Sequence, residues 1–221
     1  MPEDEIFRLT LPPGRHRLPR DFVERHQRER LFAAIVKLVD EQGYPATSLT
    51  QIVKKAGVAR HTFHELFEDK ERLFLAVFDA AAERAIQVTQ EAGEAEEGPW
   101  EDRIRAAIAA LLAELAKDPA LSRVCLTEVL SASLTTLAHY EAVMGRFAKL
   151  LRSGRRSAPR GAELPASLED VLVGGVVWML VRRLSSDPDS VEELLPDILE
   201  FALVPYLGEV AAHEVAHQSS G

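Results

Sequence analysis

The sequence predicts an all-α protein of about nine helices. Apolar residues recur three or four positions apart in most long segments, which is the spacing of a helix with one buried face. Glycine and proline fall between these segments, where helices end. No segment shows the alternation of apolar and polar residues that is typical of a half-buried strand. The chain has 221 residues, of which 47% are hydrophobic, enough for an N-terminal three-helix unit and a larger helical domain.

The chain is expected to begin with an arm and one long helix. Residues 1–19 contain four prolines and no helical period, so we expect an extended, basic arm. A helix is expected over 21–42, because its apolar positions line one face. Gly43 ends that helix, and Pro45 prevents it from restarting.

Two short helices around a tight turn are expected next. Thr47 or Ser48 can cap the first of them, and Gly57 ends it, because glycine adopts a left-handed backbone without steric cost. The second helix covers about 60–67, with Phe63 facing the core. Its outward positions carry polar side chains, namely Arg60, His61, Thr62 and His64. These features predict a helix-turn-helix domain over 20–68, whose second helix can enter a DNA groove.

The remaining helices are expected to form a second domain over 69–208. Asp69 can cap a long helix that runs to about 92, and an acidic loop follows over 91–99. Later helices are expected over 100–117, 119–133, 138–152, 167–184 and 190–207. Residues 153–165 are rich in Gly, Pro, Arg and Ser, which predicts a mobile connector. The tail over 209–221 is expected to be frayed.

The charge of the chain is divided unevenly. Its net charge is −9, yet residues 1–78 hold 13 Lys and Arg against 12 Asp and Glu. The acidity therefore lies in residues 79–221, which fits a chain with one nucleic-acid-binding end. The single cysteine, Cys125, excludes an intrachain disulfide and suits a reducing cytoplasm. We expect no membrane span and no secretory signal, because no apolar run is long enough.

The segment GYPATSLTQIVKKAGVARHTFHELFEDKERLFLAVF resembles the DNA-binding domain of TetR-type regulators. The resemblance covers about residues 26–80 and is carried by Gly43-Tyr44, Thr47-Ser48-Leu49, Ala56-Gly57-Val58, Thr62-Phe63 and Asp69-Lys70-Glu71. It implies a homodimeric, one-component transcription regulator of the cytoplasm. Such a protein would bind an inverted-repeat operator in double-stranded DNA. Ala59 and His64 depart from the family, where a capping serine and a tyrosine are usual, which weakens the expected phosphate anchoring.

The resemblance also implies individual DNA contacts. Thr47 and Ser48 would meet a phosphate at a helix N-terminus, and Lys70 would meet another. Base edges would be read from the second helix, by Arg60, His61 and Thr62, with His64 on the backbone. Arg15 and Arg17 of the arm could reach phosphates or the minor groove, or belong to a leader without a role.

The two helices expected over 167–184 and 190–207 are apolar on nearly all sides. This pattern predicts that each is buried on more than one side. A partner protomer can supply the second side, and the resemblance implies the same four-helix interface. The residues expected there are Val171, Gly174, Gly175, Trp178, Leu195, Leu199 and Leu203. The alternative is a helix pair buried within a monomer.

The central helices could enclose a cavity for a hydrophobic small molecule. The candidate lining residues are Trp100, Leu111, Cys125, Val129, His139, Met144 and Trp178. Each of them could instead be an ordinary core or surface residue, and Cys125 is expected to act as a small hydrophobic side chain.

We expect neither a catalytic site nor a cofactor nor a metal site. His61 and His64 have a spacing that a metal could use, but they lie on the presumed DNA face. Two alternatives stay open. The chain could be a dimeric helical protein that binds a small molecule without specific DNA binding, and an activator cannot be distinguished from a repressor.

Overall fold

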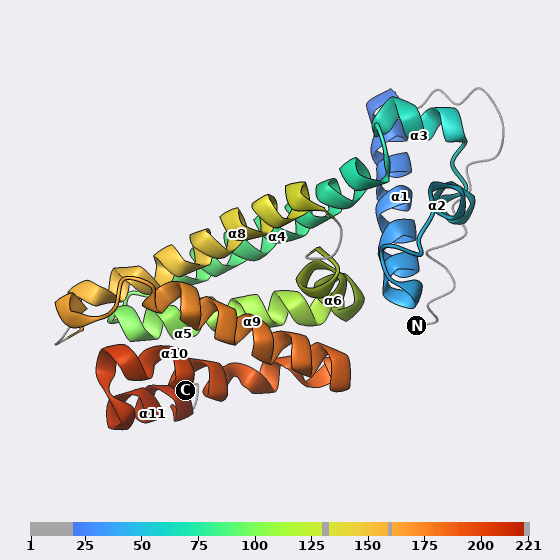
Figure 1. Ribbon diagram of the computed structural model, residues 1–221. Coiled ribbons are helices and arrows are strands. Elements are labelled where there is room, and N and C mark those ends of the chain that lie inside the picture. The colour runs from blue at the N-terminus through green and yellow to red at the C-terminus, as the bar shows by residue number, and fades with distance from the viewer. Residues whose placement is uncertain (1–19, 130–132, 159–160, 219–221) are drawn as a thin grey trace.

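The computed structural model describes residues 20–129, 133–158 and 161–218 (Figure 1). Within these ranges the chain forms ten α-helices, close to the predicted nine, and no strand, which confirms the predicted all-α fold. The α-helices are α1 (Arg20–Gln42), α2 (Leu49–Ala56), α3 (Arg60–Leu66), α4 (Lys70–Ala95), α5 (Trp100–Lys117), α6 (Pro119–Thr127), α8 (Leu134–Arg152), α9 (Leu168–Ser186), α10 (Leu195–Leu207) and α11 (Glu209–His217). Short 3₁₀ turns are η2 (Ser153–Arg156), η3 (Gly161–Glu163) and η4 (Pro188–Leu194).

The helices form two bodies joined by α4. Figure 1 shows α1, α2 and α3 together at one end, and α5 and α8 to α11 side by side in a larger body. Helix α4 begins in the first body and runs along the second, where it packs against α5 and α8. No helix in the described ranges has the length and apolar character needed to cross a bilayer.

Local sequence signals set the ends of the first helices, as predicted. Gly43 and Gly57 have φ values of +81° and +60°, a backbone that glycine adopts without a Cβ clash. Ser48 and Gln51 form a reciprocal capping box at the start of α2. Asp69 accepts the backbone N–H three residues on at 2.8 Å and so caps α4.

The N-terminal body is closed around a dense apolar core. Ile35 of α1, Ile52 of α2 and Phe63 of α3 are all 0% exposed. Phe74 of α4 joins them, with its ring centre 4.8 Å from that of Tyr44. Full burial of such side chains contributes roughly 1.5–3 kcal/mol each, so the core fixes how α3 sits on α1.

Several helix ends differ from the sequence prediction, among them the start of α10, which lies at Leu195 and not at 190 because η4 precedes it. Helix α4 continues to Ala95, into the expected loop, and α6 ends at Thr127. Helix α8 begins at Leu134 because Ser133 and Thr136 form a second capping box. The sequence analysis had placed that start four residues later.

The connector over 153–165 is held in place where it is described, which corrects the expectation of a mobile segment. Glu169 of α9 is fully buried and accepts hydrogen bonds from Arg155 at 2.7 Å and from the Tyr206 hydroxyl at 2.9 Å. Arg155 also donates to two backbone carbonyls of the connector. Burial alone would raise the pKa of Glu169, but the hydrogen bonds from Arg155 and Tyr206 hold it at about 2. The charged carboxylate therefore fastens the connector to α9 and α10.

The end of the chain also departs from the prediction of a frayed tail. Gly208, with φ +82°, turns the chain into α11, whose Ala212, Val215 and Ala216 are buried. Arg105 of α5 donates to the carbonyls of Val215 at 2.6 Å and Ala216 at 3.2 Å. The last carbonyls of a helix lack partners within it, so Arg105 satisfies them and docks α11 on α5.

Candidate functional site

Helix α3 presents the polar side chains that the sequence analysis expected to face outward. Arg60, His61 and His64 are exposed, Thr62 is half-buried, and Phe63 is 0% exposed. His61 Nε2 lies 3.2 Å from the Thr62 hydroxyl. Because Phe63 is locked in the core, it fixes the rotation of α3 and the direction of its polar face.

His64 is already engaged within the N-terminal body. Its Nδ1 lies 3.3 Å from the carbonyl of Glu68, and its ring stands edge-on to Phe63 at 5.3 Å. If Nδ1 donates to that carbonyl, a neutral ring keeps only an acceptor at Nε2. A protonated ring would add an N–H donor there. The phosphate contact expected of His64 therefore requires the charged imidazole in this geometry.

The two hydroxyls expected at a phosphate are placed differently. Ser48 is exposed at the N-terminus of α2. Thr47 is 2% exposed, and its hydroxyl donates to the Gly43 carbonyl at 2.9 Å and accepts from Gln42 at 3.2 Å. The Thr47 hydroxyl therefore holds the turn between α1 and α2, which corrects its expected role at the surface.

Lys70 is likewise turned inward. Its ammonium donates to the carbonyls of Tyr44 at 2.9 Å and Thr47 at 2.8 Å, and it lies 3.9 Å from the centre of the Tyr44 ring. Burial lowers the pKa of Lys70. Two of its three N–H donors brace the α1–α2 turn, so at most one is left for a phosphate. Arg15 and Arg17, the arm residues expected at DNA, lie outside the described residues.

A cavity of about 860 Å³ lies between the helices of the larger body and α1. Its walls come from α1, α4, α5, α6, α8, α9 and α10, and most of the lining is apolar. The apolar lining includes Phe32, Phe78, Ile108, Leu115, Phe147 and Val176. This volume and this lining are typical of sites that bury a small molecule.

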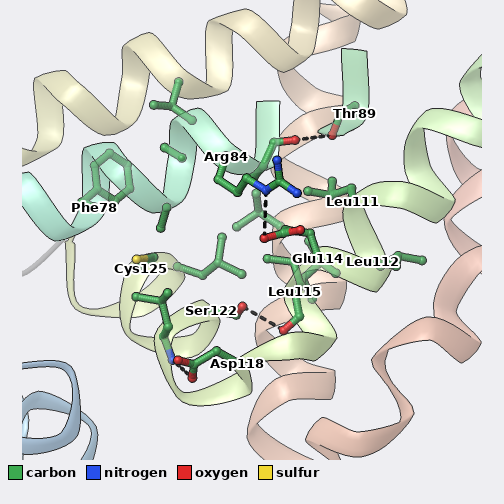
Figure 2. A pocket seen from close by; sticks show the side chains of 18 of the residues that line it. Phe78, Arg84, Thr89, Leu111, Leu112, Glu114, Leu115, Asp118, Ser122 and Cys125 are labelled. Atoms are coloured by element: carbon green, nitrogen blue, oxygen red, sulfur yellow. Dashed lines mark hydrogen bonds and ion pairs between the residues drawn. The ribbon is translucent and has the colours of Figure 1, made fainter. Parts of the chain in front are cut away.

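A small charged group interrupts the apolar lining. Figure 2 shows Arg84 of α4 directed at Glu114 of α5, with Nε 3.5 Å from Oε1. Lys117 donates to the other carboxylate oxygen at 2.6 Å, and this hydrogen bond lowers the pKa of Glu114. The Ser122 hydroxyl donates to the Leu115 carbonyl at 3.0 Å. These groups give the cavity one polar wall.

The expected lining residues divide into two sets. Three of them line the cavity, namely Leu111, Cys125 and Met144. Four do not, namely Trp100, Val129, His139 and Trp178. Burial raises the pKa of the Cys125 thiol to about 12, and the Asp118 charge adds to this, so the thiol stays protonated and behaves as a small apolar group.

The four misplaced residues have structural positions instead. Trp100 is buried in the core of the body and donates its indole N–H to a serine hydroxyl at 3.0 Å. Val129 belongs to the core around α1 and α4. His139 pairs with Asp79 at 2.9 Å on the surface, and Trp178 points outward. The spacing of apolar residues indicates which face of a helix is apolar. It does not indicate whether that face lines the cavity or packs against a neighbouring helix.

Helix α6 connects the cavity to the N-terminal body. Arg123 donates to Asp40 of α1 at 2.9 Å and to the Leu184 carbonyl of α9 at 3.1 Å. The Glu128 carboxylate, just past α6, accepts from the backbone N–H of Tyr44 at 2.8 Å. A movement of α6 would therefore displace the groups that it contacts in α1 and in the turn before α2.

Helix α9 carries an exposed apolar strip at helical spacing. Val171 and Trp178 are 63% and 64% exposed, and space beside Gly174 is open. Gly175 lies under the Phe201 ring of α10, where an added Cβ would come within 2.5 Å of it. Such large exposed apolar side chains are unusual on a monomer and are typical of an interface.

Two of the expected interface residues are not at this surface. Leu199 and Leu203 of α10 are 0% exposed and pack inside the protomer, which corrects their assignment. Leu195 is half-buried. Because α10 also packs on α5 and α11, much of its apolar surface is used within one chain.

Comparison with protein families identifies the N-terminal body. Residues 31–77 match the model of the bacterial regulatory proteins of the tetR family. The N-terminal body is therefore similar to the DNA-binding domain of that family. The match runs from the core of α1 through α2 and α3 into the buried part of α4. A search of curated protein sequences found no match.

Solved structures similar to this chain extend over its larger body as well. The fatty acid degradation regulator FadR from Bacillus halodurans is 19% identical, with a TM-score of 0.69, over 80% of this chain and 94% of that one. FadR from Bacillus subtilis, in complex with stearoyl-CoA, is 18% identical, with a TM-score of 0.66, over 81% and 98%. AibR, in complex with isovaleryl coenzyme A and operator DNA, is 15% identical, with a TM-score of 0.62, over 83% and 98%. At these identities the likeness shows a shared fold.

Sequence reasoning missed two features of the site. Helix α1 supplies part of the cavity wall, which its amphipathic pattern alone could not show. Residues 213–217 read His-Glu-Val-Ala-His, a spacing that places two imidazoles on one face of a helix. The expectation of no metal site overlooked this pattern.

Proposed function

We propose that the chain is a cytoplasmic, homodimeric repressor of transcription that releases an inverted-repeat operator when a small hydrophobic molecule occupies the cavity. Residues 20–68 would bind DNA, and 69–208 would bind the ligand and the partner protomer. The observation that carries the proposal is the position of α1, which lines the cavity and also supports α3. One helix thus belongs to both sites.

The exposed face of α3 supports DNA recognition. Arg60 is the residue we expect to read a base, since arginine bound to guanine is the commonest specific contact. His61, Thr62 and Ser48 would add base and phosphate contacts beside it. Arg15 and Arg17 would reach phosphates or the minor groove, as basic arms do.

The exposed strip on α9 supports a symmetric dimer. Val171, Gly174 and Trp178 would pack against the same residues of a second copy, with Phe201 of α10 beside them. A two-fold axis there would place two copies of α3 on one side of the dimer, as an inverted repeat requires. Trp178→Asp should therefore yield monomers in sedimentation velocity, and a persistent dimer would refute this interface.

The effector class we propose is an acyl chain carried on a polar head. The cavity is large and largely apolar, and structures with this fold include one with stearoyl-CoA and one with isovaleryl coenzyme A. The acyl chain of the effector would lie among apolar side chains such as Leu111 and Met144. Arg84 and Lys117 would hold its carbonyl or head group, exchanging their bonds to Glu114.

The release step would pass through α6 and α1. A ligand that displaces the wall formed by α6 would disturb the pairs Arg123–Asp40 and Glu128–Tyr44 and so shift the position of α3. The effect of the ligand is limited by the difference between its affinities for the DNA-binding and the released arrangement of the helices. Apolar contacts that exist in only one arrangement supply that difference.

A salt titration with DNA tests the proposal. The wild type should bind a duplex from upstream of its own gene, with an affinity that falls steeply as salt rises because counterions are released. Arg60→Ala should weaken binding by about 1–3 kcal/mol and relax specificity. Lys149→Ala, which removes the same charge from an exposed site on α8, serves as the matched control.

The alternative function is that of a dimeric small-molecule-binding protein without specific DNA binding. Three observations favour it: Ala59 provides no side-chain cap for α3, Lys70 is turned inward, and residues 1–78 have almost no net charge. An absence of DNA binding even at low salt, with ligand binding intact, would select this alternative.

A further inference from the structure

A group of metal-ligating side chains lies outside the sites described above, where α11 meets α10. Glu200 of α10 and His213 and His217 of α11 each offer one ligand atom, and these atoms lie within 4.8 Å of one another. We propose that these three residues bind a divalent transition-metal ion of the Zn²⁺ class. The proposal concerns binding of the ion and includes no hydrolytic step.

The two histidines are presented together by the helix itself. They are four residues apart, so they lie on one face, one turn from each other. Their ring centres are 4.1 Å apart, with 31° between the planes. Two histidines at this spacing on a helix are a known way to bind zinc. Side-chain rotation can therefore bring both imidazoles to one ion without moving the backbone.

Glu200 completes the set from the neighbouring helix. Its Oε2 lies 3.4 Å from Nδ1 of His213. Tetrahedral ligands with bonds of about 2.0–2.1 Å are separated by about 3.4 Å. This pair of atoms thus already has the spacing that a shared zinc ion needs.

His217 has the outer contact that commonly accompanies a metal ligand. Its Nδ1 lies 3.1 Å from the backbone carbonyl of His213. Donation from Nδ1 to that carbonyl fixes the tautomer and leaves the lone pair of Nε2 for a metal. Two imidazoles and one carboxylate suit Zn²⁺, Ni²⁺ or Cu²⁺, whereas Ca²⁺ and Mg²⁺ prefer oxygen ligands alone.

The framework of the site does not depend on a metal. Helix α11 is docked through its buried face and through the bonds from Arg105 to its last carbonyls. The two histidines are exposed on α11, outside its buried face, and Glu200 is half-buried on α10. A bound ion would join α11 to α10, leaving one coordination position for water. Replacement of the ligands should accordingly leave the fold intact.

Zinc titration of the untagged, full-length protein tests the proposal. After treatment with a chelator, isothermal titration calorimetry should show one Zn²⁺ per chain. H213A/H217A should lose this site, with affinity reduced by about 100-fold or more, and E200Q should reduce it about tenfold, since even outer-shell changes cost 10–100-fold. The matched control is H61A/H64A, which removes two exposed histidines from α3 and should keep the site.

Cobalt substitution provides a second readout that does not depend on the variants. Co²⁺ bound to the wild type should give the intense visible absorption of a tetrahedral nitrogen and oxygen site, and equimolar Zn²⁺ should abolish it. The proposal is overturned if one-to-one binding persists in H213A/H217A, if H61A/H64A removes it instead, or if the wild type binds neither ion.

Discussion

The two bodies of the molecule differ in how their interiors are packed. The N-terminal body fills its interior with side chains such as Ile35, Ile52 and Phe63, all of them 0% exposed. The larger body arranges its helices around a cavity of about 860 Å³. A densely packed body holds a binding surface in one shape, whereas helices around a cavity can rearrange when the cavity is filled. The comparison predicts that the N-terminal body, proposed to read DNA, is rigid and that the larger body, proposed to bind the effector, is adaptable.

The largest expected effect is a difference in sensitivity to core truncation. Phe63→Ala should destabilise the protein by about 3–5 kcal/mol, because it opens a void in a dense core. Leu111→Ala, at the cavity wall, should cost only roughly 1–2 kcal/mol, because part of that side chain already faces empty space. Urea denaturation of both variants measures the contrast. Equal losses would remove the distinction between the two bodies.

A second prediction concerns the buried carboxylate that fastens the connector. Glu169→Gln should destabilise the protein at neutral pH by about 1.5–3 kcal/mol, since it weakens charge-assisted hydrogen bonds. The pKa of Glu169 is about 2 in the folded protein, below that of an unfolded glutamate. Its stabilising contribution is therefore complete above about pH 4.3 and is lost as the pH falls toward 2. The gap in urea midpoint between wild type and variant should close over that range.

The control for this second test is Glu192→Gln in η4, where the carboxylate is exposed. The difference in urea midpoint between this control variant and the wild type should stay small at neutral pH. A gap for Glu169→Gln that stays constant down to pH 2 would show that the charge of Glu169 does not hold the connector.

The smallest effect is expected at the start of α2. Ser48→Ala removes the hydroxyl that accepts a backbone N–H and should cost about 1 kcal/mol. Thermal unfolding measures this loss. Thr50→Ala, two residues further along and exposed in the first turn of α2, is the matched control. Similar melting temperatures for the two variants would mean that the capping box adds no stability.

How much the sequence predicted differs between the two bodies for a physical reason. In the N-terminal body, Gly43, Ser48, Gly57 and Asp69 act through local backbone geometry, so their roles could be predicted without tertiary information. The orientation of the polar face of α3 followed from the expected burial of Phe63. The inward turn of Thr47 and Lys70 could not be predicted, because it depends on backbone carbonyls brought close by folding.

In the larger body the decisive contacts join residues distant in the sequence. Arg155 pairs with Glu169 in the described part of a connector that was expected to be mobile, and Arg105 docks a helix where a frayed tail was expected. Leu199 was expected at a partner surface but is covered by helices of its own chain. Periodicity reports that a helix face is apolar, but tertiary packing decides whether a cavity, a core or a partner covers it.

The central claim is that the cavity and the DNA-reading end are coupled through α6 and α1. The most direct measurement is the operator affinity of the wild type with and without stearoyl-CoA, repeated for Leu111→Trp, whose larger side chain fills part of the cavity. We predict that stearoyl-CoA weakens DNA binding of the wild type at least about fivefold, within the usual range of allosteric coupling, and leaves the variant unchanged. Stearoyl-CoA that binds in the cavity without changing the operator affinity of the wild type would contradict the coupling.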